Sequence, residues 1–240
     1  MDTQMQSTIA QANLKRLTAN PYPGRIIILG MDETGENMVQ IYAVMGRSAN
    51  SRNRVMSSED GRVFTEPADP SKVEDPSLII YNAMTEVGPF FVVSNGHQTD
   101  AVVSKISEMS LYESLEGWLY EPDKPNYTPR ITGASSIHSD RPIELAVIRR
   151  LPDGEPDLDT FQYDTKAGFG EGIMTYQGDG DPLPSFQDVP WLLPLTGDIH
   201  QVRETYWNAL NPENRVSMAI KFIPKVGDSR LFIVNRFEKV

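Results

Sequence analysis

The sequence predicts an α+β fold in which two antiparallel sheets are covered on their outer faces by helices. About ten segments have strand-like patterns and mostly form hairpins, whereas three or four helices come in blocks. The apolar runs Ile26–Leu29 and Phe90–Val93 are typical of strands that are buried on both faces. The 240 residues contain no internal repeat, linker or low-complexity run, so we expect a single domain over residues 1–240.

The first half of the chain is expected to consist mainly of hairpins. A short polar helix at Ser7–Leu17 comes first, and a rigid segment with two prolines, residues 20–24, leads into the first strand. Apolar patterns separated by turn residues predict these strands: Arg25–Met31, Met38–Met45, a hairpin through Val55 and Val63–Thr65, Leu78–Met84 and Phe90–Ser94. Pro67–Pro76, rich in proline and aspartate, is expected to be a surface loop.

The stretch from Phe90 to Asp100 has the pattern of a strand, a turn and the start of a helix. Asn95-Gly96 is expected to supply the positive φ of a sharp reversal, and Thr99 or Asp100 to cap the next segment. Polar groups at such a strand end can hold an anionic or amide-bearing ligand. An ordinary turn between packed elements is the alternative that the pattern leaves open.

Three further helices are expected, two in the middle of the chain and one near its end. Apolar spacing predicts a helix over Asp100–Met109. Ser110 and Glu113 match a capping box, in which the serine oxygen accepts from first-turn amides, and the helix they open should run to about Tyr120. Asp198 is expected to cap a helix that ends near Leu210.

The second half adds more strands and two irregular segments. The expected strands are Ile131–Ser136, Glu144–Arg150, Phe161–Tyr163, Gly172–Tyr176, and a closing hairpin of Val216–Ile223 with Arg230–Phe237. Pro152–Asp159 is predicted to be an exposed acidic turn, and Gly178–Pro194 a long loop that serves as a flap or an oligomer contact. The glycines at 168, 170 and 172 are not expected to form a phosphate loop, because no Lys-Ser/Thr follows them.

Composition excludes several classes of function. The net charge of −11 argues against a nucleic-acid or anionic-membrane partner. Cysteine is absent and there are only three histidines, so we expect no metal site and no thiol chemistry. No apolar run approaches the ~20 residues that span a bilayer. The N-terminus lacks the pattern of a signal peptide, and we therefore expect a cytoplasmic protein.

The one basic cluster in this acidic chain consists of Arg47, Arg52 and Arg54. The first 65 residues carry seven basic and six acidic side chains, whereas the remaining 175 carry 15 and 27. Three arginines within eight residues can form a local anion site, for example for one phosphate. A solvated basic loop is the alternative interpretation of this charge pattern.

Several short motifs between about residues 20 and 135 occur together in one order: Tyr22-Pro23-Gly24-Arg25-Ile26, Gly46-Arg47-Ser48, Asn53-Arg54, Tyr81-Asn82, Val92-Val93-Ser94-Asn95-Gly96 with Thr99-Asp100, Tyr120-Glu121 and Thr128-Pro129-Arg130-Ile131. In these motifs the sequence resembles the archaeal-type inosine monophosphate (IMP) cyclohydrolase family and its bacterial relatives. It departs from the family at Ser51-Arg52, at Leu119, where relatives often have an acid, and by an extra residue near Tyr127.

The resemblance implies a four-layer αββα sandwich like that of the N-terminal-nucleophile hydrolases. It also implies a cyclic amidine hydrolase that closes 5-formamidoimidazole-4-carboxamide ribonucleotide to IMP with loss of water, the last step of purine biosynthesis. No step needs a metal or another cofactor, and family members are expected to assemble as homo-oligomers. An N-terminal nucleophile is not expected here, because Met1-Asp2 offers no Ser, Thr or Cys.

The resemblance also implies which side chains bind the substrate's phosphate and carboxamide. Arg54 is the first choice for the phosphate, with Arg47 and Arg25 as helpers, because an arginine fork binds phosphate in a bidentate manner. Asn82 and Asn95 can each donate and accept, which suits the carboxamide. Three further residues of the matching motifs are expected to contribute to substrate binding: Asn53, Ser94 and Gly96.

For the chemical step, the expected catalytic residues are Tyr81, Glu121 and Arg54. The developing oxyanion needs donors such as Arg130, the Tyr81 hydroxyl or the amides at Asn95-Gly96. Glu121 and Tyr81 are the best candidates for proton transfer, and His97 is a weaker one. Each also has an ordinary role open to it: Tyr81 as a strand aromatic, Glu121 as a solvated residue after a helix, Arg130 in a surface ion pair and Asn82 at a strand end.

Two other functions remain open on the sequence. The first is a nucleotide-binding or regulatory relative of the same fold that has lost catalysis, an alternative motivated by Leu119. The second is an amidohydrolase of the N-terminal-nucleophile type, which would require processing that exposes Thr3 or Ser7.

Overall fold

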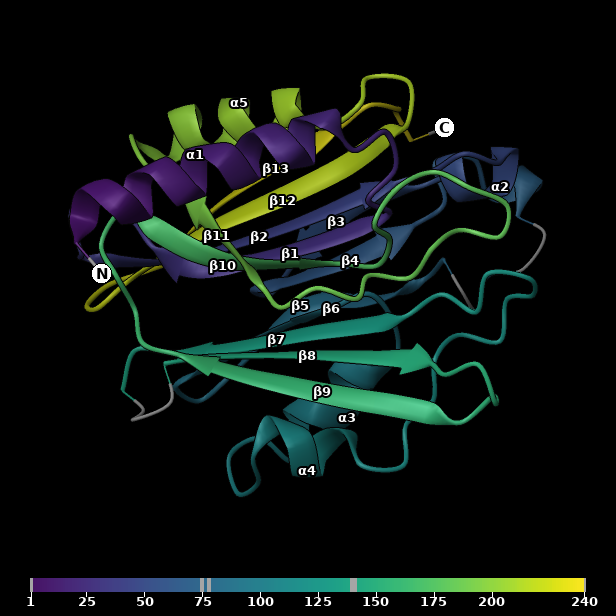
Figure 1. Ribbon diagram of the computed structural model, residues 1–240, viewed down its shortest axis with the longest axis horizontal. Helices are drawn as coiled ribbons and strands as arrows, with labels where there is room; N and C mark the ends of the chain where they lie inside the picture. Colours follow the sequence, from purple (N-terminus) through teal and green to yellow (C-terminus); the bar gives the residue numbers. More distant parts are fainter. Residues whose placement is uncertain (1, 74–75, 77–78, 139–141, 240) are drawn as a thin grey trace.

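The computed structural model describes residues 2–73, 76, 79–138 and 142–239, in which thirteen strands form two antiparallel sheets (Figure 1). The six-stranded sheet has the order β11 (Trp191–Pro194), β10 (Phe169–Met174), β1 (Arg25–Met31), β2 (Asn37–Met45), β12 (Arg215–Pro224) and β13 (Arg230–Asn235). The seven-stranded sheet runs in chain order: β3 (Val55–Glu59), β4 (Arg62–Glu66), β5 (Tyr81–Val87), β6 (Phe90–Ser94), β7 (Arg130–Ser136), β8 (Ile143–Arg150) and β9 (Pro156–Tyr163). The second sheet is therefore one continuous stretch of chain inserted into the first.

Helices cover the outer faces of both sheets and complete four layers (Figure 1). The helices α1 (Thr3–Ala19) and α5 (Ile199–Ala209) lie on the six-stranded sheet, and α3 (Gln98–Val103) and α4 (Leu111–Leu115) lie on the seven-stranded sheet. The short helix α2 (Ala49–Arg52) and the 3-10 helix Pro70–Lys72 lie in connections. This arrangement confirms the predicted α+β sandwich. Within the described residues, no helix is both long and apolar enough to cross a membrane.

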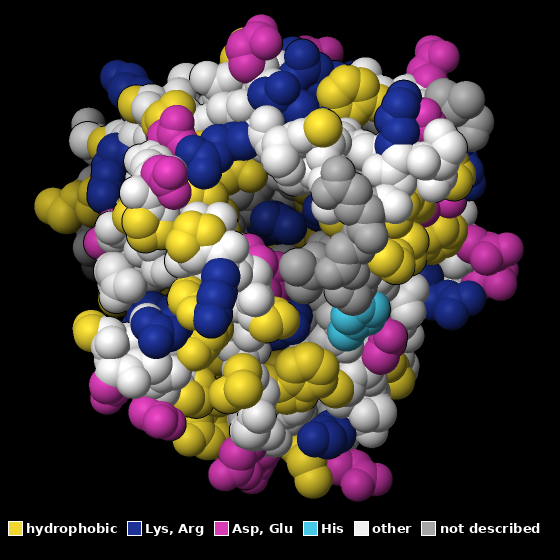
Figure 2. All heavy atoms as spheres, turned by 90° about the vertical axis from the view of Figure 1, so that its right-hand side faces the viewer, with side chains coloured by type: hydrophobic (Ala, Val, Ile, Leu, Met, Phe, Trp, Pro, Cys, Tyr) yellow, Lys and Arg dark blue, Asp and Glu magenta, His cyan; other side chains and the backbone are white. Residues whose placement is uncertain are grey.

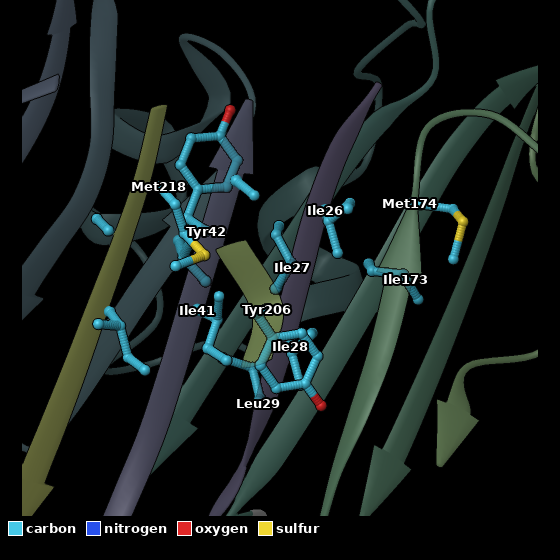
Figure 3. Close-up of a cluster of buried hydrophobic side chains, with 14 of the residues drawn as sticks. Ile26, Ile27, Ile28, Leu29, Ile41, Tyr42, Ile173, Met174, Tyr206 and Met218 are labelled. Carbon is cyan, nitrogen blue, oxygen red and sulfur yellow. The ribbon is translucent and has the colours of Figure 1, made fainter. Parts of the chain in front are cut away.

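The main hydrophobic core lies around β1 and the strands beside it. Ile26, Ile27, Ile28 and Leu29 are at most 2% exposed, because β1 lies inside its sheet and has a packed layer on each face. Figure 3 shows them with other buried side chains of β2, β10, β12 and α5. A buried Ile or Leu side chain stabilises a fold by roughly 1.5–3 kcal/mol relative to its exposed state. This double burial explains why the strand appears in the sequence as a continuous apolar run.

Gly30 marks the closest approach of β1 to its neighbour β10. A Cβ atom placed there would lie 2.3 Å from the Phe169 carbonyl oxygen and 2.4 Å from the Gly170 Cα. Both are backbone atoms, so the sheet would have to deform to accept a methyl group. We expect Gly30→Ala to lower the free energy of unfolding by about 1–3 kcal/mol, measured by urea denaturation. Gly178→Ala is the matched control, because no heavy atom lies within 4 Å of its added Cβ; equal stability of the two variants would contradict the prediction.

The predicted helix starts at Ser110 and Asp198 are confirmed. Ser110 Oγ accepts from the Glu113 amide and the Glu113 carboxylate accepts from the Ser110 amide at 2.8 Å, which forms a capping box. Asp198 makes the same reciprocal contact with Gln201 at the start of α5. Both signals are local in sequence, which is why they could be recognised without the fold.

The predicted turn at Asn95-Gly96 is wrong in its geometry. Gly96 does not have the positive φ expected of it, although the predicted order is present: β6 ends at Ser94, residues 95–97 turn, and α3 begins at Gln98. Nor does Thr99 or Asp100 cap that helix: the N-cap is His97, which makes no side-chain capping bond. The Thr99 hydroxyl instead donates to the Gly96 carbonyl at 2.9 Å. The β-hairpin pattern of Asn-Gly was overridden because the next segment is a helix.

Other boundaries also differ from the prediction. The N-terminal helix is longer, at Thr3–Ala19, and the two helices expected to reach Met109 and Tyr120 end at Val103 and Leu115. The predicted acidic turn at 152–159 contains the start of β9, and the predicted loop at 178–194 ends in the edge strand β11. These two edge strands have mixed or short apolar patterns, so pairing rather than composition defines them. Leu78, the expected start of the fifth strand, lies outside the described residues.

Buried polar side chains join the two sheets across the core. Tyr42 of β2 and Tyr81 of β5 share a hydrogen bond between their hydroxyl oxygens of 2.6 Å. Gln40 of β2 donates through Nε2 to the Phe91 carbonyl at 2.8 Å and to Ser135 Oγ at 3.0 Å. These bonds fix how the two sheets lie relative to each other. They also place the Tyr42–Tyr81 pair close to the cavity described next.

Candidate active site

A cavity of about 300 Å³ opens on the side of the molecule that carries α2. Its lining comes from both sheets and from the loops at this end. Figure 2 shows this side, on which a hollow with basic side chains inside it lies near the centre. The volume is at the lower end of the range of small-molecule sites.

Two buried arginines lie together in this cavity, one from each sheet. Arg25 is the first residue of β1 and is 7% exposed, and Arg54 directly precedes β3 and is 1% exposed. Within the described part of the chain, Arg25 Nε and Arg54 Nε and Nη1 have no hydrogen-bond partner. Burial, reinforced by the charge of Arg25, lowers the pKa of Arg54. Buried donors of this kind suit an anionic or strongly polar ligand.

Glu121 supplies a buried carboxylate beside these arginines. It lies in the loop after α4, is 2% exposed, and is fixed by its backbone amide, which donates to the Thr128 carbonyl at 2.9 Å. Burial raises the pKa of Glu121 to about 7, although the positive charges of Arg25 and Arg130 oppose that rise. Burial works against the charge of Arg25, but the negative charge of Glu121 raises the pKa of that guanidinium overall. A carboxyl group with this pKa can both accept and donate a proton near neutral pH.

The Tyr42–Tyr81 pair lies next to the same arginines. Tyr81, the first residue of β5, is 4% exposed, and both hydroxyl groups interact electrostatically with Arg25 and Arg54. Burial raises the pKa of Tyr42, so its hydroxyl stays protonated. The inner end of the cavity thus combines two guanidinium groups and a carboxyl group, and the phenol pair, which does not itself line the cavity, interacts with both arginines.

The mouth of the cavity has a different character. Arg47 lines it with Ser48, Asn50 and Ser51 of the α2 region. Arg47 forms an ion pair with Asp179, donates to the Gly180 carbonyl at 3.0 Å, and lies over the Tyr22 ring at 5.0 Å. Its side chain is 35% exposed, far more than those of the two inner arginines.

Part of the segment predicted as a flap does lie over this mouth. Leu183 lines the cavity, and its amide donates to Asn126 Oδ1 at 3.0 Å. Together with the contacts of Asp179 and Gly180 to Arg47, this bond fastens residues 179–183 to the opening. Residues 179–183 thus contact the cavity mouth, and whether the segment serves as a flap or an oligomer contact stays a prediction.

Sequence reasoning missed several lining residues. Tyr22 and Tyr176 stack with ring centroids 5.9 Å apart, and the Tyr176 hydroxyl is hydrogen-bonded to Thr128, which also contacts Asp123. Asp123 follows Glu121 by two positions, and Thr128 stands in the Thr-Pro-Arg motif, so both were close to signals already recognised. Tyr176 ended the predicted strand Gly172–Tyr176, but that pattern did not indicate that it reaches the cavity, where its amide donates to the Pro23 carbonyl just before β1.

Several predicted site residues lie elsewhere. Tyr81, Ser94, Asn95, Gly96 and Arg130 are not among the residues that line the cavity; of these, Asn95 donates to Glu121 and Arg130 lies 4.0 Å from its carboxylate. Ser94 and Asn95 are fully buried, and the Ser94 hydroxyl donates to the Gly96 carbonyl at 3.1 Å.

The other two predicted asparagines are also outside this cavity. Asn82 Nδ2 donates to Asp100 Oδ1 at 2.8 Å. Asn53 Nδ2 donates to the Asp69 carbonyl at 2.8 Å and lines a different surface depression. His97 is an exposed residue at the start of α3 and is not part of the lining either.

The fold and the cavity define an α+β sandwich protein with a cationic binding cavity that also contains a buried acid. The family described as IMP cyclohydrolase-like protein matches residues 22–227, most of the chain. The chain therefore belongs to the IMP cyclohydrolase-like protein family. This result confirms the resemblance recognised from the sequence motifs.

Individual relatives agree with this assignment. A Haloquadratum walsbyi protein named IMP cyclohydrolase is 33% identical over 191 residues, which cover 76% of this chain and 82% of that protein. Proteins of the same name from Methanopyrus kandleri and Methanothrix thermoacetophila are 31% and 35% identical over 116 and 123 residues. These two matches cover 46% and 49% of this chain, and the chain spans only 57% and 59% of those relatives.

Proposed function

We propose that this protein closes 5-formamidoimidazole-4-carboxamide ribonucleotide to IMP with loss of water, a step of purine biosynthesis. The main observation behind the proposal is a pair of buried arginines with N–H groups that have no hydrogen-bond partner among the described residues. They lie beside a buried carboxyl group whose pKa is about 7. The printed name of the relatives, IMP cyclohydrolase, supports the same reaction. The proposed setting is the cytoplasm, and assembly as a homo-oligomer is part of the proposal.

The reaction requires one bond to form, one to break and two protons to move. The carboxamide nitrogen attacks the formyl carbon, and the former carbonyl oxygen then leaves as water. One proton comes from the carboxamide nitrogen and one from the formamido nitrogen, and both end on the departing oxygen. The protein therefore has to accept a proton from nitrogen, stabilise a developing oxyanion and deliver protons to oxygen.

The inner end of the cavity can meet these needs. Ionised Glu121 accepts the proton of the attacking nitrogen and passes it to the former carbonyl oxygen, and it then transfers the formamido proton to the same oxygen as water leaves, since its pKa of about 7 suits each transfer. Arg54 and Arg25 have buried N–H groups that can donate to the oxyanion, and the phenol of Tyr81 lies near both guanidinium groups. Preorganised donors in a buried site need little reorganisation when the charge develops.

The mouth of the cavity is better suited to the phosphate. Arg47 is partly exposed and lies with the hydroxyl-bearing Ser48 and Ser51 at the opening, where a phosphate retains part of its hydration. This arrangement favours Arg47 over Arg54 as the principal phosphate ligand. A bound phosphate would replace the carboxylate of Asp179 as the partner of Arg47. The stacked Tyr22–Tyr176 pair offers an apolar wall between the two ends.

The position of Leu119 removes the reason that its identity had given for a regulatory role. Its side chain is 56% exposed and does not line the cavity. Its backbone carbonyl accepts from Arg130 Nε at 2.9 Å, a contact that any residue at this position can provide. The missing acid at position 119 therefore leaves the cavity unchanged.

The deciding experiment is to incubate the purified protein with 5-formamidoimidazole-4-carboxamide ribonucleotide and to follow the absorbance of IMP. Turnover supports the proposed reaction. If the folded protein binds IMP in calorimetry but forms none, the regulatory alternative holds and the enzymatic proposal is wrong.

The Tyr81→Phe variant tests whether the phenol acts in the chemical step or in substrate binding. We expect kcat to fall about 10- to 100-fold with KM changed less than about twofold, because one hydrogen-bond donor next to the developing charge is removed. Tyr206→Phe is the matched control, since that hydroxyl is also buried but donates to the Pro194 carbonyl at 2.7 Å and does not interact with Arg25 or Arg54. A kcat for Tyr81→Phe equal to that of the control would remove Tyr81 from the mechanism.

A further inference from the structure

Three side chains behind Glu121 form a hydrogen-bonded support, here called the carboxylate support: Asn95, Gln98 and Arg130. Asn95 Nδ2 donates to Glu121 Oε1 at 3.3 Å, and Gln98 Nε2 donates to Asn95 Oδ1 at 3.0 Å. Arg130 Nη1 donates to Gln98 Oε1 at 3.0 Å and lies 4.0 Å from Glu121 Oε1. The series of contacts through Asn95, Gln98 and Arg130 thus begins and ends at Glu121 Oε1.

The carboxylate support is buried and anchored to the backbone on several sides. Asn95 and Gln98 have no exposed surface, and the Arg130 side chain is 12% exposed. Asn95 donates to the Pro129 carbonyl at 2.9 Å and accepts from the Ile131 amide at 2.8 Å. These bonds join the segment between β6 and α3 to the start of β7, so Asn95 has a fixed position relative to Glu121. None of the three is among the residues that line the cavity.

We propose that Gln98 is a positioning residue for Glu121, and that it acts by holding Asn95 and Arg130 against the rear of the carboxylate. The inference rests on the proposed function only in so far as Glu121 moves protons in the reaction. Gln98 is suited to this role because its amide donates to one partner and accepts from the other. A leucine has a similar size and can do neither.

The charges that face Glu121 determine the direction of the expected effect. They are the guanidinium groups of Arg25, Arg54 and Arg130 and the carboxylate of Asp123. Without Gln98, Arg130 loses one of its two acceptors and keeps the Leu119 carbonyl, and Asn95 loses one of the two donors to its Oδ1. The ionised carboxylate then loses nearby positive charge and a hydrogen bond, so its pKa should rise.

Gln98→Leu is therefore expected to lower kcat about 10-fold at pH 7 with KM nearly unchanged, and to move the pH midpoint of kcat/KM upward. A second probe, Gly96→Ala, removes no polar group. An added Cβ at Gly96 lies 2.5 Å from Arg130 Nη1, the end of a flexible side chain, and the φ there is not left-handed. It should displace Arg130 and shift the midpoint in the same direction. The Gly96→Ala variant also tests the proposal if Gln98→Leu does not fold.

The control is Ser217→Ala, which removes a buried hydroxyl that donates to Asn235 Oδ1 at 2.7 Å outside the cavity lining and should leave the midpoint unchanged. The titration of Glu121 is also followed by NMR of protein with carboxyl-labelled glutamate, assigned with Glu121→Gln. An upward shift in the two probes and not in the control supports the proposal. Folded Gln98→Leu and Gly96→Ala proteins with the wild-type midpoint overturn it. If the wild-type protein forms no IMP, the proposed function fails, while the NMR titration still tests the carboxylate support.

Discussion

Glu121→Gln is expected to lower kcat about 1,000-fold, within the range by which a positioned acid–base group accelerates a reaction. Glutamine keeps the size of the side chain but cannot accept the proton of the attacking nitrogen. IMP binding, measured by calorimetry, should change only a few-fold. Glu171→Gln is a close control, because burial also raises the pKa of Glu171 to about 7, but that residue is not part of the cavity lining. A Glu121→Gln enzyme with more than a tenth of wild-type kcat would contradict the assigned role.

The pH dependence of the same pair of proteins provides a second test. The wild-type kcat/KM should fall as the pH drops below about 7, because the carboxyl group that must accept a proton becomes protonated. This inflection should be absent in Glu121→Gln. The raised pKa also means that folding favours the protonated carboxyl, so this contribution to stability is present below the unfolded pKa and is lost as pH rises through 7. The variant should therefore gain stability relative to wild type between pH 5.5 and pH 8, measured as the melting temperature at the two pH values.

Arg54→Met should produce the second large effect, with opposite consequences for activity and stability. We expect kcat/KM to fall about 100- to 1,000-fold, since an N–H donor to the oxyanion is lost. The free energy of unfolding should rise by about 1–3 kcal/mol, because methionine replaces a buried guanidinium that lacks partners on Nε and Nη1. Activity assays and urea denaturation measure the two changes.

Arg52→Met is the matched control for that variant. Arg52 is two residues away, but its guanidinium donates to the Gly46 carbonyl at 3.0 Å and to Asn214 at 3.2 Å, and it lines a different depression. It should retain activity and gain no stability. If Arg54→Met is instead less stable than the wild-type protein, the Arg54 guanidinium has partners that stabilise it. Its interpretation as a hydrogen-bond donor available to the substrate is then wrong.

Much of the fold could be predicted because the signals are local. Arg25–Met31 matches β1 at both ends, since its apolar run is interrupted by polar residues on either side. The capping residues Ser110 and Asp198 were equally clear. Trp191–Pro194 could not be recognised as a strand, because it is short, contains proline and exists only through its pairing with β10.

Four charged residues of the cavity could be predicted from the sequence, whereas Asp123 was missed and Arg130 does not line the cavity. Arg25, Arg47, Arg54 and Glu121, all assigned from motifs, do meet in one cavity. The roles given to Asn95 and Arg130 differ from those that the structure favours, because the sequence cannot tell which side of a carboxylate a polar residue will occupy. Leu183 reaches the cavity through a loop, where no periodic pattern guides prediction.

In the sequence, the strands of the seven-stranded sheet lie between β2 and β10 of the six-stranded sheet, so parts of the site are synthesised at different times. The strands β3 to β9 are made in one continuous stretch, whereas β2 finds its partner β12 only when the ribosome reaches residues 215–224. Arg25 is made early, yet Tyr176 and Leu183 of the same cavity appear about 150 residues later. Nascent chains released before β12 should therefore contain every charged group of the site and have no activity. This is tested by measuring IMP formation in a series of C-terminally truncated chains. We expect activity only in chains that include β12.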